Sequence, residues 1–275
     1  MIPSAFDYVR AENAEAALSA LAEHGDEAKL MAGGHSLIPL MKLRLAAPAV
    51  VVDIGRIADL SYVREDGDTL AIGALTKHRA IETDALVAEH APLLAHATGH
   101  VGDPQVRHRG TLGGALAHGD PASDLPSVVL AMGGTLVAQG PNGTREIAAD
   151  EFFSGFLETA LADDEMLTEV RVPKMAGAGW SFQKFNRRAQ DWAIVGCAIV
   201  NNGSTGIGLV NMDSRPIRSA GAEAVMNGGG TAEDAAAAVA EGLNPPADAN
   251  ASVEFRNHLA GVLVRRGLEE AAGSD

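Results

Sequence analysis

Two glycine-rich segments constrain this chain more than any other feature of its sequence. The first reads Ala32-Gly33-Gly34-His35-Ser36, and the second reads Thr111-Leu112-Gly113-Gly114. Glycine lacks a Cβ, so the main chain can adopt positive φ and bring its N–H groups close to an anion. Apolar residues at helical spacing from Leu37 to Arg44 predict a helix directly after the first loop. One such loop usually makes only a turn, but the pair is typical of a site for a diphosphate group.

Apolar periodicity predicts three successive units that mix helices and strands. In the first unit we expect strands at 6–9, 29–31 and 50–54 and helices at 14–23 and 37–44. In the second we expect strands at 69–72, 134–138, 145–148 and 167–172, with helices near 77–83 and 124–132. Residues 173–179 are rich in Gly and Ala and predict a linker. In the third unit we expect antiparallel strands at 180–185, 193–201 and 207–211, then helices from Ala220, Ala232 and Ser252.

Charge and hydropathy exclude some classes of partner. The 275 residues carry 21 Lys and Arg against 36 Asp and Glu, a net charge of −15 that argues against nucleic acid or an anionic membrane surface. No apolar run reaches membrane-spanning length, and the first ten residues do not resemble a secretion signal, so we expect a cytoplasmic protein without an integral membrane segment.

The single cysteine limits the metal chemistry of the chain. An iron–sulfur cluster needs about four cysteine ligands, a structural zinc site needs several soft ligands and a disulfide needs two cysteines. Cys197 lies in an apolar, strand-like run, so we interpret it as a buried small side chain. The chain is therefore expected to hold no metal centre by itself. It also lacks a Gly-X-Gly-X-X-Gly segment after a strand, which argues against a Rossmann-type dinucleotide site.

In order along the chain, these motifs resemble the FAD-binding medium subunit of the molybdenum hydroxylases, the family of xanthine dehydrogenase and aerobic carbon monoxide dehydrogenase. The resemblance rests on the first loop and on the following segments: Ile72-Gly73-Ala74, Arg107 to Gly114, Asp120-Pro121, Ser123 to Pro126, Glu165-Met166-Leu167, Lys184 to Arg188, Asp191-Trp192-Ala193 and Phe255 to Ala260. It extends over the whole chain.

The resemblance implies an α+β protein with two domains. Residues 1–175 would form a two-lobed vanillyl-alcohol-oxidase-type (PCMH-type) FAD-binding domain, with lobes at about 1–57 and 58–175. Residues 176–275 would form a C-terminal α+β domain like that of the carbon monoxide dehydrogenase flavoprotein.

Position within the family's motifs implies which residues bind FAD. Ala32, Gly33, Gly34, His35 and Ser36 correspond to the first diphosphate loop, with Leu37 opening the helix behind it. Thr111, Gly113 and Gly114 correspond to the second loop, where a hydroxyl and main-chain amides would complete the anion site. Ala115 departs from the family, which often has Asn or Ser there, so one side-chain contact to the cofactor would be missing.

Four further residues are assigned by the same correspondence. Asp124 matches a carboxylate near the adenosine ribose, although its spacing alone equally allows an N-cap of the next helix. Val101 matches an apolar residue against the flavin ring, and Leu167 an aliphatic residue on the adenine; taken singly, each is more often plain core. Lys184 matches a lysine that contacts the cofactor.

The function implied by the resemblance is electron transfer in a larger complex. A molybdopterin-bearing large subunit would oxidise the substrate, a [2Fe-2S] small subunit would carry single electrons, and this chain would pass them through FAD to an external acceptor. The expected assembly is a dimer of heterotrimers, with no catalytic acid, base or nucleophile on this chain. Arg107, His108 and Arg109 either offset the diphosphate, face the partner or pair with surface carboxylates, and His35 either contacts FAD or is solvated.

Two alternatives remain open from the sequence. One is a stand-alone FAD-dependent oxidoreductase of the same fold, such as a relative of the enolpyruvyl-sugar reductase of cell-wall synthesis. The other is a non-catalytic assembly subunit that binds FAD weakly, which the missing side chain at Ala115 would favour.

Overall fold

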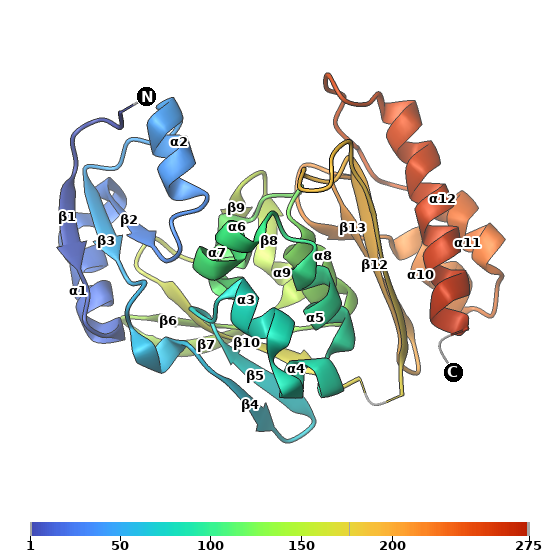
Figure 1. Ribbon diagram of the computed structural model, residues 1–275, viewed down its shortest axis with the longest axis horizontal. Coiled ribbons are helices and arrows are strands. Elements are labelled where there is room, and N and C mark those ends of the chain that lie inside the picture. Colours follow the sequence, from blue (N-terminus) through green and yellow to red (C-terminus); the bar gives the residue numbers. More distant parts are fainter. Residues whose placement is uncertain (1, 176, 274–275) are drawn as a thin grey trace.

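Three units follow one another across the computed structural model, which describes residues 2–175 and 177–273. Each unit is built on its own main sheet, and the helices of the middle unit lie between the other two units (Figure 1). Helices and strands are mixed throughout, which confirms the expected α+β class.

The first unit is a small parallel sheet. Its strands are β1 (Asp7–Arg10), β2 (Ala28–Met31) and β3 (Val50–Asp53), with β3 in the centre. Parallel neighbours need crossover connections, which α1 (Ala14–His24) and α2 (Leu37–Leu43) provide. The side chain of Asn13 caps α1 by accepting from the Ala16 amide at 2.8 Å. Short 3₁₀ turns at Gly25–Glu27 and Ala58–Leu60 complete the unit.

The second unit is a five-stranded antiparallel sheet in the order β4-β5-β10-β6-β7. Its strands are β4 (Val63–Asp66), β5 (Thr69–Gly73), β6 (Thr135–Gly140), β7 (Gly143–Ala148) and β10 (Met166–Pro173). Its helices are α3 (His78–Thr83), α4 (Ala85–His90), α5 (Pro92–Gly99), α6 (Pro104–Arg109), α7 (Leu112–His118), α8 (Asp124–Ala131) and α9 (Ala149–Phe152). A small ribbon of β8 (Phe153–Gly155) and β9 (Glu158–Thr159) follows α9.

The third unit is a four-stranded antiparallel sheet with helices on both faces. Its elements are β11 (Gly179–Phe185), β12 (Val195–Asn201), β13 (Thr205–Val210), β14 (Ile217–Arg218), α10 (Ala220–Asn227), α11 (Ala232–Ala238) and α12 (Val253–Ala272). One face packs on α10 and α12, and the other on α8 of the second unit. A Cβ at Gly208 would lie 1.9 Å from the Ser127 carbonyl oxygen, so glycine is what allows α8 to approach this closely. The second and third units therefore share a tightly packed boundary.

The expected elements of the three units are confirmed, but several short elements are missing from the expectation. The prediction passed over α4 to α7, each of six to eight residues, because a stripe of apolar positions is hard to recognise over fewer than three turns. One of them, α6, carries a start signal: its N-cap Asp103 accepts from the Val106 amide at 2.8 Å, and Pro104 follows as the first helical residue. Ala176, within the expected linker, lies outside the described residues.

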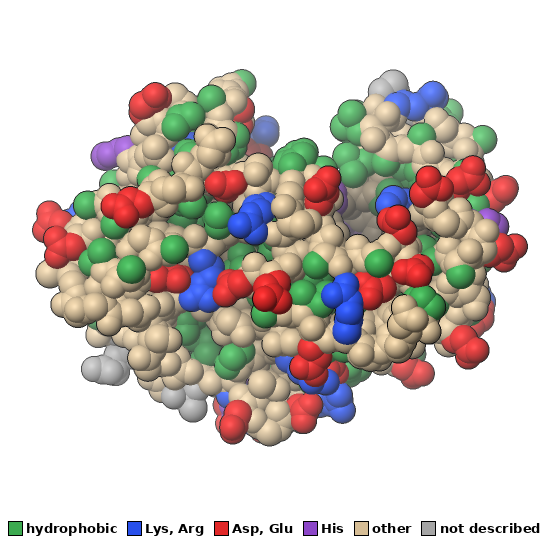
Figure 2. Space-filling view, turned by 180° about the vertical axis from the view of Figure 1, so that it is seen from behind, with side chains coloured by type: hydrophobic (Ala, Val, Ile, Leu, Met, Phe, Trp, Pro, Cys, Tyr) green, Lys and Arg blue, Asp and Glu red, His purple; other side chains and the backbone are tan. Residues whose placement is uncertain are grey.

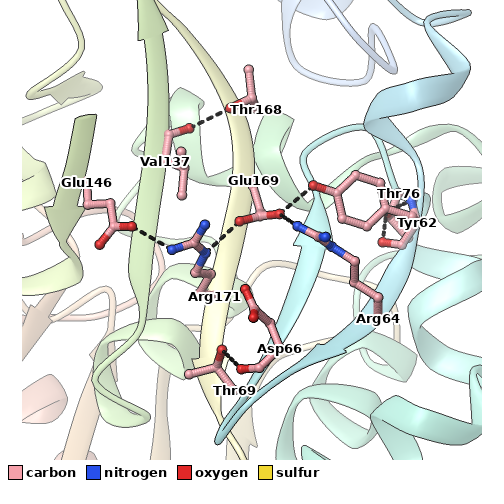
Figure 3. Close-up of polar contacts among 10 residues, drawn as sticks. All are labelled: Tyr62, Arg64, Asp66, Thr69, Thr76, Val137, Glu146, Thr168, Glu169 and Arg171. Atoms are coloured by element: carbon pink, nitrogen blue, oxygen red, sulfur yellow. Dashed lines mark hydrogen bonds and ion pairs between the residues drawn. The ribbon is translucent and has the colours of Figure 1, made fainter. Parts of the chain in front are cut away.

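A charged cluster covers the face of the five-stranded sheet opposite its helices (Figure 3). Glu169 is 5% exposed and accepts from Tyr62 at 2.5 Å, Arg64 at 2.9 Å and Arg171 at 2.6 Å. Burial opposes ionisation of Glu169, but these three donors hold its pKa below the ordinary value for a glutamate. Burial and the bond to Glu169 raise the pKa of Tyr62 to about 12. The carboxylate thus links β10 to β4, across β5, and to Tyr62 just before β4.

We predict that Glu169→Gln lowers the free energy of unfolding by about 1–3 kcal/mol, because charge-assisted hydrogen bonds are lost at a buried site. Because the folded pKa is depressed, the contribution is present above the unfolded pKa and is lost as pH falls through the folded value. Urea denaturation at neutral pH and near pH 3 should show that acidification lowers the free energy of unfolding less in the variant than in the wild type. The matched control is Glu146→Gln, which removes an exposed partner of Arg171 and should cost about 0.5 kcal/mol or less. Equal effects of the two substitutions would contradict the assignment.

Candidate functional site

One cavity of about 600 Å³ gathers every site residue expected from the sequence. The lining includes all fourteen: Ala32, Gly33, Gly34, His35, Ser36, Leu37, Val101, Thr111, Gly113, Gly114, Ala115, Asp124, Leu167 and Lys184. They come from all three units, and the molecule is visibly hollowed beside the first unit, at the right of Figure 2. A cavity of this volume is within the range of cofactor sites.

The first glycine loop presents a row of free amides. Within the described residues, no protein acceptor takes the N–H of Gly33, Gly34, His35, Ser36 or Leu37. The loop is fixed instead through its carbonyls, since the Gly34 and Ser36 oxygens accept from the turn of α2 that follows. Ser36 stands at the N-cap position but its side chain makes no capping bond. Successive free amides form the kind of concave donor surface that binds an anion.

The second glycine loop differs, because its amides are already used. Leu112 donates to the Thr76 carbonyl at 3.1 Å, and Gly113 donates to the Ala74 carbonyl at 2.9 Å. The Thr111 side chain accepts from the Gly114 amide at 3.1 Å and thereby caps α7. The Ala115 amide donates to the Thr111 carbonyl at 3.1 Å. In this structure the second loop therefore forms a closely packed wall of the cavity, and the free main-chain donors belong to the first loop.

The first loop meets the segment just before the second loop at Gly33. A Cβ at Gly33 would lie 2.3 Å from the Arg109 carbonyl oxygen and 3.0 Å from the Gly110 Cα. Any side chain here would push the first loop away from the turn between α6 and α7, so the residue must be glycine for the two segments to meet. This contact sets where the row of free amides faces.

A buried ion pair closes the other end of the cavity. Lys184 on β11 donates to Asp124 Oδ2 at 2.7 Å and to the His100 carbonyl at 3.1 Å. Both side chains are less than a tenth exposed. The second oxygen of Asp124, Oδ1, is buried and has no hydrogen-bond partner. Burial raises the pKa of Asp124 to about 6, although Lys184 lowers it in part.

The capping interpretation of Asp124 is wrong. Ser123 occupies the N-cap position of α8 and Asp124 is the first helical residue, with its carboxylate turned to Lys184. An unpaired buried carboxylate oxygen is uncommon in proteins and fits an acceptor for a ligand hydroxyl.

The apolar residues expected in the site also line the cavity. Leu167 is 6% exposed and stands at the irregularity where β10 shifts register against β6 between Leu167 and Glu169. Such a bulge redirects side chains. Val101 is partly exposed after α5, and the Ala115 methyl lies on α7.

Arg107, one of the basic residues before the second loop, is paired within the protein. It donates to Glu82 at 3.0 Å and to the Val101 carbonyl at 3.1 Å.

Two other residues named from the sequence have simple surroundings. His35 is exposed, and its Nδ1 lies 3.1 Å from the Gly33 carbonyl oxygen. Cys197 is fully buried and burial raises the pKa of its thiol to about 12, which confirms its interpretation as a core side chain.

Further residues line the cavity besides those expected from the sequence, among them His78 and Trp192. His78 on α3 is 4% exposed, its Nδ1 lacks a partner, and burial lowers its pKa to about 4, so it is neutral. Trp192 is 61% exposed and lines the rim from the third unit. Its motif, Asp191-Trp192-Ala193, was visible in the sequence, whereas His78 carries no local signal because only the tertiary fold brings it to the cavity.

The described residues contain no group of three or more His, Cys, Asp or Glu side chains placed to hold a metal ion. Among the helices of residues 2–175 and 177–273, none is long and apolar enough to cross a membrane.

We predict that Lys184→Met raises the pKa of Asp124 above about 6, because Lys184 supplies the positive charge that opposes the burial effect. A ¹³C NMR titration of the aspartate carboxyls, assigned with Asp124→Asn, measures the change. Lys174→Met is the control, since that lysine pairs with Glu65 on the surface and should leave the titration of Asp124 unchanged. An unchanged or lower pKa in Lys184→Met would show that the ion pair does not govern Asp124.

Both parts of the chain match models of known protein families. Residues 4–175 match the family model for the FAD binding domain in molybdopterin dehydrogenase, and residues 180–271 match the CO dehydrogenase flavoprotein C-terminal domain. The chain is 39% identical to the carbon monoxide dehydrogenase medium chain of Hydrogenophaga pseudoflava, over 98% of both proteins. It is 36% identical to the glyceraldehyde dehydrogenase medium chain of Sulfolobus acidocaldarius, over 99% of this chain and 100% of that protein.

A solved structure shows the same arrangement of the chain. The carbon monoxide dehydrogenase from Hydrogenophaga pseudoflava, in a form that lacks the Mo-pyranopterin moiety of its molybdenum cofactor, aligns with a TM-score of 0.95 and 40% identity. The alignment covers 99% of each chain.

Proposed function

The chain belongs to the FAD-binding medium subunits of the molybdenum hydroxylases, and from this membership we propose how its own residues hold FAD and which partners it serves. It is a flavoprotein subunit of an oxidoreductase of the carbon monoxide and xanthine dehydrogenase type, with FAD as its cofactor and electron transfer as its role. The relatives act on different substrates, because one medium chain is named for carbon monoxide and another for glyceraldehyde. The substrate is therefore assigned in our proposal to a partner subunit.

The observation that carries the assignment of FAD to this cavity is the pairing of free donors and free acceptors. The five amides of the first loop can surround an anion, and the unpaired oxygen of Asp124 can accept from a sugar hydroxyl. A diphosphate-bridged dinucleotide carries both groups. Apolar side chains elsewhere in the lining suit the flat aromatic rings. The residues present thus fit FAD.

In our proposal each wall of the cavity has a distinct role. The first loop, from Ala32 to Leu37, holds the diphosphate through main-chain N–H groups. Thr111, Gly113, Gly114 and Ala115 form the wall against which that loop packs, so their contribution is chiefly to shape. Asp124 binds the adenosine ribose, and Lys184 keeps the Asp124 carboxylate ionised and oriented.

Two apolar residues complete the proposed assignment. Leu167 packs on the adenine and Val101 on the flavin ring, as the family correspondence implies. When bound, FAD supplies a carrier that exchanges one or two electrons at a time. Neutral His78 and the apolar lining give the site a low local polarity, and the exposed rim at Trp192 leaves an approach from outside.

The partners are the second part of the proposal. The single cysteine of this chain cannot ligate an iron–sulfur cluster, so the clusters that deliver electrons must lie on another chain. We assign them to a [2Fe-2S] small subunit and the substrate chemistry to a molybdopterin-bearing large subunit, assembled as a dimer of heterotrimers. The proposed domain boundary lies between residues 175 and 176, and the proposed location is the cytoplasm, which suits a chain that can form no internal disulfide.

We predict that Gly33→Ala reduces FAD affinity at least tenfold, because the new methyl would displace the first loop from Arg109 and misplace its amides. Each lost charge-assisted bond is worth about 1.5–3 kcal/mol, and about 1.4 kcal/mol corresponds to tenfold in affinity. FAD titration followed by flavin fluorescence measures the effect. The control is Gly99→Ala, where a Cβ meets only ordinary contacts at 3.6 Å or more. Wild-type affinity in Gly33→Ala would refute the role of the first loop.

The proposed complex is tested by purifying the tagged chain from its native host under gentle conditions. We expect two further subunits in stoichiometric amount, one carrying iron and acid-labile sulfide and one carrying molybdenum, identified by mass spectrometry and metal analysis. A chain that purifies alone and oxidises a substrate by itself would contradict the proposal and support the stand-alone oxidoreductase.

A further inference from the structure

Two histidines at the C-terminal end of α5 lie with their ring nitrogens together. His96 is on the helix and His100, four residues on, is its C-cap residue, so the two side chains lie one above the other. Their Nε2 atoms are 3.2 Å apart and their ring centroids 4.8 Å apart. Both residues are exposed, and neither side chain lines the cavity described above, although the His100 carbonyl accepts from Lys184.

We propose that His96 and His100 form a two-ligand binding site for a borderline divalent transition metal ion such as Cu²⁺, Ni²⁺ or Zn²⁺. Imidazole nitrogen is a preferred ligand for these ions. With metal–nitrogen bonds of about 2.0–2.1 Å, nitrogens at this separation would subtend roughly 100° at the ion, close to the tetrahedral value. The separation observed between the Nε2 atoms therefore already matches that of two ligands of one ion.

The surroundings hold the two rings in this arrangement. The His96 ring lies 5.3 Å from the Trp180 ring and the His100 ring 5.9 Å from the Phe182 ring, both on β11. These contacts cross the boundary between the second and third units, so the rings are supported by packing on another sheet. Supported ligands lose less conformational freedom on binding than free surface side chains.

The site lies at the C-terminal end of α5, where the helix dipole favours a positive ion. No third protein ligand lies close by among the described residues, so water or a partner group would complete the coordination.

A metal ion bound here would be held by this chain, against the expectation that the chain holds no metal centre by itself. A single cysteine limits sulfur ligation, whereas this pair offers imidazole nitrogens. Neither histidine lines the proposed FAD cavity, and the His100 carbonyl that accepts from Lys184 is not a proposed metal ligand.

The test uses the full-length chain without a histidine tag, treated with a chelator and then dialysed free of it. Each of Cu²⁺, Ni²⁺ and Zn²⁺ is titrated, with binding followed by calorimetry and by thermal unfolding, and Mg²⁺ serves as the control ion. We expect Cu²⁺ to bind most tightly and each of the three to raise Tm, by roughly 5 °C at 100 times its Kd. Because Trp180 adjoins His96, bound Cu²⁺ should also quench tryptophan fluorescence.

Variants decide whether the histidine pair is the site. His96→Ala and His100→Ala should each weaken binding roughly tenfold or more, since one of two protein ligands is lost. His258→Ala removes an exposed histidine of α12 that has no histidine four residues away and should leave the titration unchanged. Binding that survives in both site variants, or a wild-type chain whose Tm ignores all three ions at millimolar concentration, would overturn the proposal. Unchanged Tm of the metal-free variants shows that they fold.

Discussion

The close approach of Gly33 to the carbonyl of Arg109 determines the geometry of the site. The first unit contributes a loop with free amides, and the second contributes a loop whose Leu112, Gly113 and Gly114 amides are used internally. Neither loop could enclose a dinucleotide alone. The contact between them turns two local chain reversals into two walls of one cavity, and it requires that residue 33 has no side chain.

The third unit takes part in the same cavity from a distant part of the sequence. Lys184 reaches across the boundary from β11 to Asp124 and to the carbonyl of His100. Breaking a buried ion pair leaves one charge without compensation, so this contact links the docking of the third sheet to the state of the site. Helix α8, whose first residue is Asp124, packs closely against Gly208 of the third sheet. In our proposal these few contacts couple cofactor binding to the arrangement of the units.

Much of the fold and the composition of the site could be predicted from the sequence. Alternating apolar strands, alanine-rich helices and ordered family motifs indicated the main elements and fourteen residues that line one cavity. The sequence could not show which main-chain N–H groups donate to protein acceptors and which are free. The second loop has the same glycine pair as the first, yet its N–H groups are taken by Ala74, Thr76 and Thr111, which depends on tertiary packing. His78 was overlooked for the same reason, because burial against distant segments gives it its neutral state.

A comparison of FAD with FMN tests the central claim most directly, that the first-loop amides and the carboxylate of Asp124 hold the diphosphate and the adenosine ribose. FMN has the same ring but lacks the bridging diphosphate and the adenosine. The measurement is calorimetric titration of the flavin-free chain with each compound, with the bound chromophore identified by mass. Our account predicts that FAD binds at least roughly a hundredfold more tightly than FMN, since several charge-assisted bonds are at stake. Equal affinity for the two flavins would contradict it.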